Sequence, residues 1–201
     1  MARVEATCDR RTTQRFGYSP QRWRRGSVSA VTRLMFQKAG ESDAAAVADL
    51  RTAAARDLTT RFGRGHWSSE PTQRGVMSGM RGAEIWVGKR AGVPVATFRV
   101  TTRKPWAIDP TYFVSCERPI YLTDMAVDPR AQRRGIGSRC IEEILRIARD
   151  WPSDSLRLDA YDAEAGAGRF YERCGFRHVA SVAYRGVALR YYERDVGEAT
   201  S

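Results

Sequence analysis

The residues that could do chemistry gather between Met125 and Ser138, a strand-loop-helix stretch with two glycines in its loop. This order aims unpaired backbone N–H groups and the positive end of a helix dipole at one point, which favours an anion such as phosphate. Gly135 and Gly137 remove side chains that would block close approach. Three arginines can add charge-assisted contacts, namely Arg133, Arg134 and Arg139.

Two other phosphate-binding motifs do not fit this loop. A Walker loop ends in Gly-Lys-Ser/Thr, which is absent from the stretch. A dinucleotide fingerprint needs a third glycine, and residues 135–140 lack it. Taken alone, the loop leaves one plain alternative open, a strand-to-helix turn with a glycine cap.

The chain carries a strong positive charge. Its 201 residues are enough for one full-sized domain, and the formal net charge is +11. Arginine supplies most of this charge, since Lys38, Lys89 and Lys104 are the only lysines. Guanidinium groups bind phosphate well, but a GC-rich genome also favours arginine codons, and both explanations stay open. The charge therefore suggests an anionic partner without naming it.

No segment predicts a membrane or secretory protein. No run approaches about 20 apolar residues, and the N-terminus lacks the apolar region of a signal peptide. The four cysteines are scattered and form no metal-binding spacing, so we expect a reduced cytoplasmic protein without a metal site. A cysteine nucleophile is disfavoured because Cys140 falls on an apolar helix face and Cys174 lies beside a helix-ending glycine.

Residues 1–30 differ from the rest of the chain. They hold seven arginines, two acidic residues and almost no periodic apolar pattern, which predicts a disordered arm. The arm could bind nucleic acid, or it could be an over-long gene start without function. The folded domain is predicted over residues 31–196, and a short tail follows at 197–201.

Apolar periodicity predicts the elements of this domain. Strands are expected over 31–38, 84–89, 93–102, 120–127, 156–161, 176–184 and 187–193. Helices are expected over 43–62 with Ser42 as N-cap, from about 70 to 81, over 137–150 and over 165–174. The long connection 103–119 holds several aromatic residues and is expected to be ordered. This order predicts a mixed sheet with helices on its faces.

Two motifs give this arrangement a family resemblance. The segment Gln132 to Gly137, after Met-Ala-Val-x-Pro, resembles motif A of the GNAT acetyltransferases. The segment Phe170 to Phe176 resembles the family's Phe-Tyr-x-x-x-Gly-Phe signature. The resemblance implies an α/β (mixed α+β) fold with a central, largely antiparallel sheet flanked by helices. It also implies an acetyl-CoA-dependent N-acetyltransferase.

The same resemblance implies where acetyl-CoA binds. Backbone N–H groups of the Gln132–Gly137 loop hold the pyrophosphate. The strand that precedes the loop hydrogen-bonds the pantetheine arm, and the thioester lies near residues 158–160. The expected cofactor-binding residues are Met125, Ala126, Val127, Gln132, Arg133, Arg134, Gly135, Ile136, Gly137, Ser138 and Tyr171. The expected catalytic residues are Tyr171, which protonates the departing thiolate, and Asp124, which serves as the base.

Several of these residues keep a structural alternative. Tyr171 could be a packed core aromatic, and Asp124 a hydrogen-bonded carboxylate at a strand end. Further base candidates are Glu84, Asp159 and His66. Candidates for the acceptor wall are Trp67, Trp106, Tyr112 and Phe113, or these pack within loops. Glu164 departs from the family pattern, which often has asparagine there.

The acceptor is a primary amine that the sequence does not identify, on a small molecule or a protein. One alternative function is a non-catalytic acyl-CoA sensor, which Glu164 favours. Another is nucleic-acid binding through the basic arm, which predicts strongly salt-dependent affinity. The oligomeric state is not readable from the sequence, although homodimers are frequent among folds of this kind.

Overall fold

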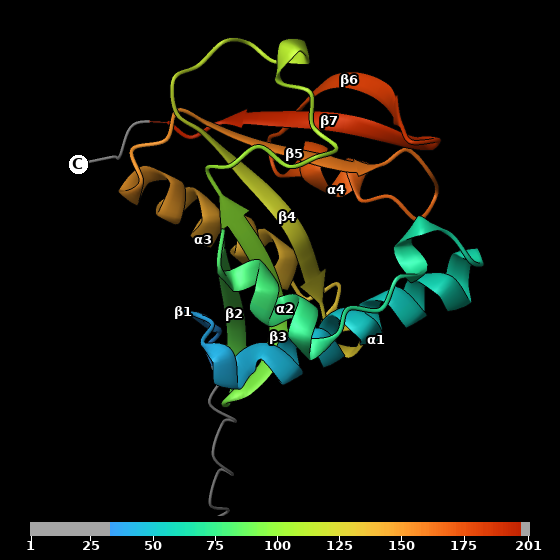
Figure 1. The fold of residues 1–201 in the computed structure, drawn as a ribbon. Helices are drawn as coiled ribbons and strands as arrows, with labels where there is room; N and C mark the ends of the chain where they lie inside the picture. The colour runs from blue at the N-terminus through green and yellow to red at the C-terminus, as the bar shows by residue number, and fades with distance from the viewer. Residues whose placement is uncertain (1–32, 198–201) are drawn as a thin grey trace, which may run out of the picture. The chain divides into compact units, whose positions relative to one another are not determined.

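The computed structural model describes residues 33–197, so the arm predicted for residues 1–30 and most of the predicted tail lie outside the described part. One seven-stranded sheet runs in the order β1-β2-β3-β4-β5-β7-β6 (Figure 1). Its strands are β1 Met35–Lys38, β2 Glu84–Arg90, β3 Val93–Thr101, β4 Pro119–Val127, β5 Ser155–Tyr161, β6 Arg177–Tyr184 and β7 Val187–Asp195. The helices are α1 Ala44–Phe62, α2 Gln73–Met80, α3 Ile136–Asp150 and α4 Gly168–Arg173. The predicted order of elements and the mixed sheet are confirmed.

Helix α3 covers one face of the sheet because its apolar residues recur every three or four positions. Cys140, Ile144 and Ala148 on this stripe are fully buried. They pack against alternate residues of the central strands, among them Ile120 on β4 and Leu156 on β5. Helix α4 adds aromatic rings to the same cluster. This core fixes the start of α3 against β4.

Helices α1 and α2 cover the opposite face. Val47 of α1 and Val76 of α2 pack against Ile85 and Val87 of β2. The apolar face predicted for α1 is only partly used in this way, because Leu58 near its C-terminal end stays half-buried and lines cavities. The first half of α1 therefore builds core, and the second half builds a wall of the site.

Three predicted helix starts are wrong. Helix α1 begins at Ala44, one residue later than predicted, and its N-cap residue is Asp43 rather than Ser42, because the Asp43 carboxylate accepts the Gly40 N–H at 3.0 Å in a short 3-10 turn before the helix. Helix α2 begins at Gln73, because the Thr72 hydroxyl caps it and Glu70 instead pairs with an arginine of α1. Helix α4 begins only at Gly168, after residues 163–166 form a turn.

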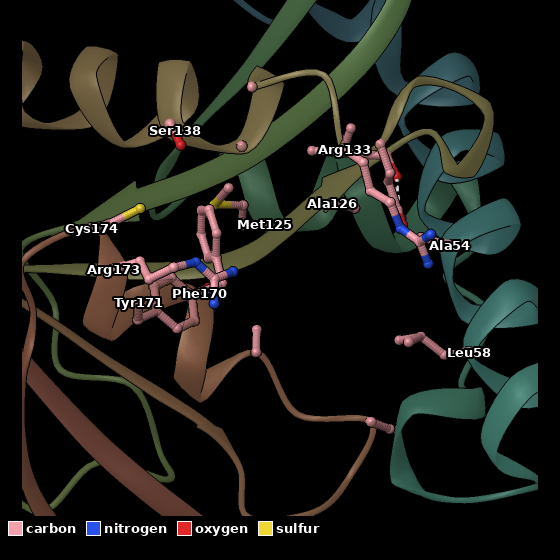
Figure 2. Close-up of a pocket in the computed structure, with 16 residues that line it drawn as sticks. Ala54, Leu58, Met125, Ala126, Arg133, Ser138, Phe170, Tyr171, Arg173 and Cys174 are labelled. Carbon is pink, nitrogen blue, oxygen red and sulfur yellow. Dashed lines mark hydrogen bonds between the residues drawn. The ribbon is translucent and has the colours of Figure 1, made fainter.

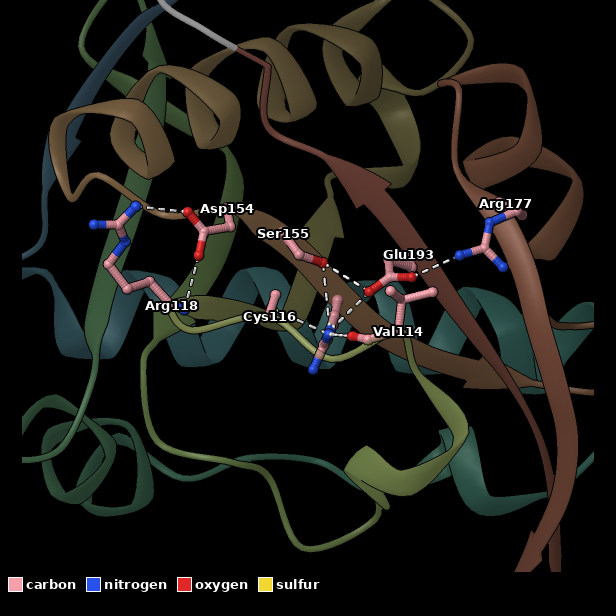
Figure 3. Close-up of polar contacts among 8 residues, drawn as sticks. Val114, Cys116, Arg118, Asp154, Ser155, Arg177 and Glu193 are labelled. Atoms are coloured by element: carbon pink, nitrogen blue, oxygen red, sulfur yellow. Dashed lines mark hydrogen bonds and ion pairs between the residues drawn. The ribbon is translucent and has the colours of Figure 1, made fainter.

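The long connection between β3 and β4 is ordered, as predicted. Ile108 and Phe113 pack on Tyr121 and Tyr191, on the sheet face away from α3. A buried ion pair on the sheet anchors the connection. Arg157 on β5 donates to the Glu193 carboxylate at 2.9 Å and to the backbone carbonyl of the connection (Figure 3).

Both side chains of this ion pair are only 4% exposed. Glu193 also accepts from the Ser155 hydroxyl at 2.9 Å and from Arg177 at 2.7 Å, so both oxygens of its carboxylate have hydrogen-bond donors (Figure 3). A buried ion pair is stable only when such additional hydrogen bonds satisfy it. The network joins β5, β6, β7 and the connection into one half of the sheet.

Within residues 33–197, no helix is both long and apolar enough to cross a bilayer.

Candidate active site

The turn between β4 and α3 presents the N-terminus of α3 without a side-chain cap. Gly135 is the N-cap residue and has a left-handed backbone with φ 75°, and Arg133 is also left-handed with φ 59°. Helix geometry leaves the N–H groups of the first turn without helical acceptors. A β-carbon on Gly137 would lie 3.1 Å from the Phe170 ring, so only glycine fits there without displacement. The turn is built to bring an anion against backbone N–H groups.

The edge of β4 that faces β5 is unpaired along most of its length. The two strands pair in parallel only from Pro119 to Tyr121, opposite Ser155 to Arg157. Beyond Tyr121 the two strands no longer pair. Residues from Leu122 to Val127 therefore have a free β5-facing edge, which can hydrogen-bond an extended ligand arm.

A bulge interrupts β4 at Asp124. Its backbone is left-handed with φ 52°, and the pairing register with β3 shifts between Thr97 and Arg99. Residues that follow a bulge face the opposite side from that expected by simple alternation. Thus Leu122 and Met125 both pack toward the α3 core, whereas Thr123 and Asp124 contact Arg99 on the other face.

A cavity of about 530 Å³ lies between the free part of β4, the start of α3 and the start of α4. Figure 2 shows Phe170, Tyr171 and Met125 along one side and Ala54 and Leu58 of α1 along the other. Nine of the predicted cofactor residues line it: Met125, Ala126, Val127, Gln132, Arg133, Gly135, Gly137, Ser138 and Tyr171.

Two predicted cofactor residues do not line this cavity. The side chain of Ile136 is 2% exposed and belongs to the core, so only its backbone N–H faces the turn. Arg134 is exposed beside the turn. Gln132 lines the cavity, but its side-chain amide is already engaged. It donates to the Val127 carbonyl at 3.1 Å and holds the loop against β4.

Tyr171 is buried against the aromatic rings of Phe170 and Phe176, at centroid distances of 5.2 and 5.5 Å. Burial first, and then the nearby carboxyl of Asp159, raises the pKa of Tyr171 above its ordinary value of 10.0. Its hydroxyl therefore keeps its proton at neutral pH while one side of the ring lines the cavity. The residue has both features that the sequence proposed as alternatives, since it packs in the core and faces the cavity.

A second cavity of about 320 Å³ adjoins the first. The two share Ala54, Leu58, Met125 and Ala126, so they meet between α1 and the unpaired part of β4. The second cavity has its own polar and aromatic lining, which includes Arg51, His66, Trp67, Asp124 and Tyr161.

Only one of the four predicted acceptor-wall aromatics lines this second cavity. Trp67 stands edge-on to Tyr161 at 5.9 Å, and its indole N–H is held by the Gly63 carbonyl. The prediction does not hold for Trp106, Tyr112 and Phe113, because the connection that carries them packs over β5 and β7. Phe113 stacks on Tyr191 there.

The base candidates fall in different places. Asp124 and His66 line the second cavity. Glu84 instead pairs with Lys38 at the far edge of the sheet. Asp159 lies on β5 beyond the point of separation, where burial, and secondarily Asp124, raises the pKa of its carboxyl.

Asp124 is held by two arginines. Its Oδ2 lies 3.0 Å from Arg99 Nε and 3.5 Å from Arg51 Nη1. The hydroxyl of Thr123 accepts from the same Arg99 Nε at 2.8 Å. The bulge in β4 is what directs Asp124 and Thr123 to these arginines.

The cysteines of the described region offer no activated thiolate. Burial raises the pKa of Cys140 to about 12. Burial is also the main cause that raises the pKa of Cys116 and of Cys174. A thiol with a raised pKa is a poor nucleophile at neutral pH.

Comparison with known proteins identifies the family of this chain. The model of the Acetyltransferase (GNAT) family matches residues 47–176. The chain belongs to the GNAT acetyltransferase family. The matched segment contains both sequence motifs and the residues that the two cavities share. Acetyl-CoA is the cofactor of this family.

Solved GNAT structures share the fold of this domain. An N-acetyltransferase from Staphylococcus aureus Mu50 is 18% identical with a TM-score of 0.61, over 83% of this chain and 100% of that one. The yncA protein of Salmonella typhimurium, solved with its cofactor acetyl-CoA, is 16% identical with a TM-score of 0.57, over 84% and 96%. The ribosomal-protein-S18-alanine N-acetyltransferase of Escherichia coli is 15% identical with a TM-score of 0.59, over 84% and 97%. A comparison with curated proteins finds no match.

The GNAT site of this chain fits acetyl-CoA by its own geometry. The uncapped start of α3 suits a pyrophosphate, the free edge of β4 suits the pantetheine arm, and the first cavity connects the two. Glu164, which departs from the family pattern, is exposed and lines neither cavity. Its carboxylate therefore does not enter the cofactor cavity in this structure.

Sequence reasoning missed residues that other elements bring to this GNAT site. Arg173 and Cys174 line the first cavity from the end of α4. Arg51 lines the second, from a helix face that showed only apolar spacing. The family signature around Phe170 could have indicated the α4 residues, whereas nothing in the sequence marks Arg51, because 73 residues separate it from Asp124.

Proposed function

We propose that this GNAT protein transfers the acetyl group of acetyl-CoA to a primary amine by direct attack on the thioester. The observation that carries the proposal is the meeting of two cavities at Met125 and Ala126, on the part of β4 that no longer pairs with β5. One cavity suits the donor and the other suits the acceptor. Their junction brings the two reactants together, which is a large part of catalysis in a direct transfer.

The first cavity holds the donor through backbone groups. Bound acetyl-CoA supplies an acetyl group that is activated as a thioester. N–H groups at the start of α3 and the guanidinium of Arg133 bind its phosphates. The free N–H and C=O groups of β4 from Leu122 to Val127 align its arm as an additional strand.

Tyr171 keeps a proton at the inner end of the same cavity and gives it to the sulfur that departs. Its hydroxyl is protonated at neutral pH, so the proton is available before the reaction begins. In the second cavity, Asp124 takes the ammonium group of the acceptor and receives its proton. The ion pairs with Arg51 and Arg99 hold the Asp124 carboxylate in place for this step.

Calorimetry with acetyl-CoA, followed by thiol release with a panel of amines, tests the proposal. We expect binding and amine-dependent release of coenzyme A. Absence of binding at millimolar acetyl-CoA refutes the proposal altogether. Binding without turnover of any amine supports instead an acyl-CoA sensor.

Two variants then separate the base candidates. Asp124→Asn is expected to lower kcat by about 10²- to 10⁴-fold, the usual contribution of a proton-transferring group. His66→Gln lines the same cavity and serves as the matched control. A larger loss of kcat in His66→Gln than in Asp124→Asn assigns the base to His66.

A further inference from the structure

Arg51 is a buried cation whose hydrogen bonds are incomplete. Its side chain is 12% exposed, and among the residues that the structure describes its Nε and Nη2 atoms are buried without a hydrogen-bond partner. Within residues 33–197 its only ion-pair contact is the 3.5 Å approach of Nη1 to Asp124, which is longer than a good N–H···O hydrogen bond. Leaving such donors unpaired is costly, so the position calls for a partner that the described part of the chain does not supply.

The charges around Arg51 are also unbalanced. Arg51 and Arg99 both approach Asp124, and the shorter contact belongs to Arg99. The neighbouring Asp159, whose pKa burial raises, makes no ion pair with either arginine among the described residues. Burial also lowers the pKa of Arg51, with Asp124 opposing that effect. The ion-paired group of Arg51, Arg99 and Asp124 therefore has one more cation than anion. An incoming anionic group would balance its charge.

Arg51 and Asp124 lie in the wall of the same cavity, the one that adjoins the donor site. This places a cation and an anion side by side, 3.5 Å apart, beside the proposed point of acetyl transfer. A guanidinium pairs with a carboxylate through two parallel N–H groups. Pairing through Nε and Nη2, which are buried in this structure, requires the Arg51 guanidinium to turn toward the cavity when the carboxylate binds.

We propose that the acceptor is an amine with a carboxylate next to it, as in a free α-amino acid. Its ammonium group lies on Asp124, and its carboxylate pairs with Arg51. The inference rests on the proposed function, since it specifies the acceptor of that same reaction. It makes Arg51 a specificity-determining residue and leaves the chemistry of transfer unchanged.

The size and lining of the second cavity favour a small acceptor. Its volume of about 320 Å³ is at the lower end of ligand pockets, which span roughly 300–1,000 Å³. Trp67 and Tyr161 give it an aromatic wall, and Leu58 adds an aliphatic one. These surfaces suit the side chain of a single amino acid.

The test compares each amino acid with its own amide, which keeps the amine and the side chain and removes only the negative charge. Thiol release is measured with a panel of both forms at saturating acetyl-CoA. We expect the acid to exceed the amide in kcat/KM by about 10- to 100-fold, because the amide leaves the buried Arg51 guanidinium unpaired. The comparison uses the unaltered protein, so it does not depend on whether a variant folds.

Arg51→Gln is then expected to bring the ratio of acid to amide close to one. Arg61→Gln is the control, because Arg61 is on the same helix but pairs at the surface with Asp57 and lines neither cavity. Calorimetry of the amino acids alone gives a readout besides activity, with binding that Arg51→Gln weakens and Arg61→Gln does not.

Equal kcat/KM for acids and amides overturns the inference, and so does a preference that persists in Arg51→Gln. Turnover of peptide N-termini or simple amines, without turnover or binding of any amino acid, overturns it as well but leaves the proposed function intact. Failure of acetyl-CoA to bind refutes the proposed function, and amino-acid binding that depends on Arg51 is still measured independently.

Discussion

The buried carboxylate of Glu193 provides a prediction whose magnitude follows from the structure. Glu193→Gln keeps the size of the side chain but removes the negative charge that faces Arg157 and Arg177. Arg157 is 4% exposed, so its charge is then left in the interior without a counter-charge. Breaking a buried pair in this way costs about 3–5 kcal/mol.

For a domain of this size, 1 kcal/mol corresponds to roughly 2–4 °C in the melting temperature. We therefore expect Glu193→Gln to lower the midpoint by about 6–20 °C. Differential scanning calorimetry and urea unfolding measure the loss. The urea m-value should stay unchanged if the folded state keeps its compactness.

Asp154→Asn is the matched control. The same change of carboxylate to amide occurs in a pair with Arg118, whose side chains are 58% and 34% exposed (Figure 3). Water solvates both charges there, so the loss of stability should be far smaller. If the two variants unfold at the same urea concentration, burial does not set the strength of the Glu193 network and the reasoning is refuted.

Three further predictions concern the site. Tyr171→Phe should bind acetyl-CoA as before in calorimetry but turn over amines about 10²- to 10⁴-fold more slowly, and an unchanged kcat would remove the hydroxyl from the mechanism. Gly137→Val should weaken acetyl-CoA binding by at least about tenfold, since the new side chain meets the Phe170 ring and fills the anion turn, and equal affinity would show that the turn is not the phosphate site. Iodoacetamide should spare Cys140 in the folded protein at pH 8, because its pKa of about 12 lies above the ordinary 9.0 and the thiolate forms only as the pH rises toward 12. Mass spectrometry measures the labelling of each cysteine. If Cys140 is labelled as fast as Cys116, the thiol of Cys140 is not buried in the folded protein.

The donor side of the site was predictable because it lies within one local stretch. The turn between β4 and α3 contains the glycines, the helix start and the arginines within a few residues of each other. Helix geometry alone then leaves the backbone N–H groups at the start of α3 free. The start of α4 was less predictable. Residues 163–166 form a turn of their own before Gly168, whose missing side chain makes room for the Tyr192 hydroxyl.

The acceptor side could not be predicted, since it is assembled from distant elements. The bulge at Asp124 turns its carboxylate toward Arg99 and Arg51, and no local pattern in the sequence indicates a bulge there. Trp67 and Trp106 are both aromatic residues in irregular segments. Only the packing of those segments on different parts of the sheet decides which one lines the cavity.

The short junction between β4 and β5 has a consequence for how the domain opens. Strands β1–β4 and β5–β7 form two well-paired halves that are joined by three residue pairs. Few interstrand hydrogen bonds join the halves, which are otherwise held together by the shared core under α3, so we expect the amide protons of Ile120 and Leu156 to exchange with solvent at similar rates. A molecule that lies along the free edge of β4 fills the gap between the halves. Hydrogen exchange in both halves should therefore slow when such a molecule binds, even at amides that it does not touch.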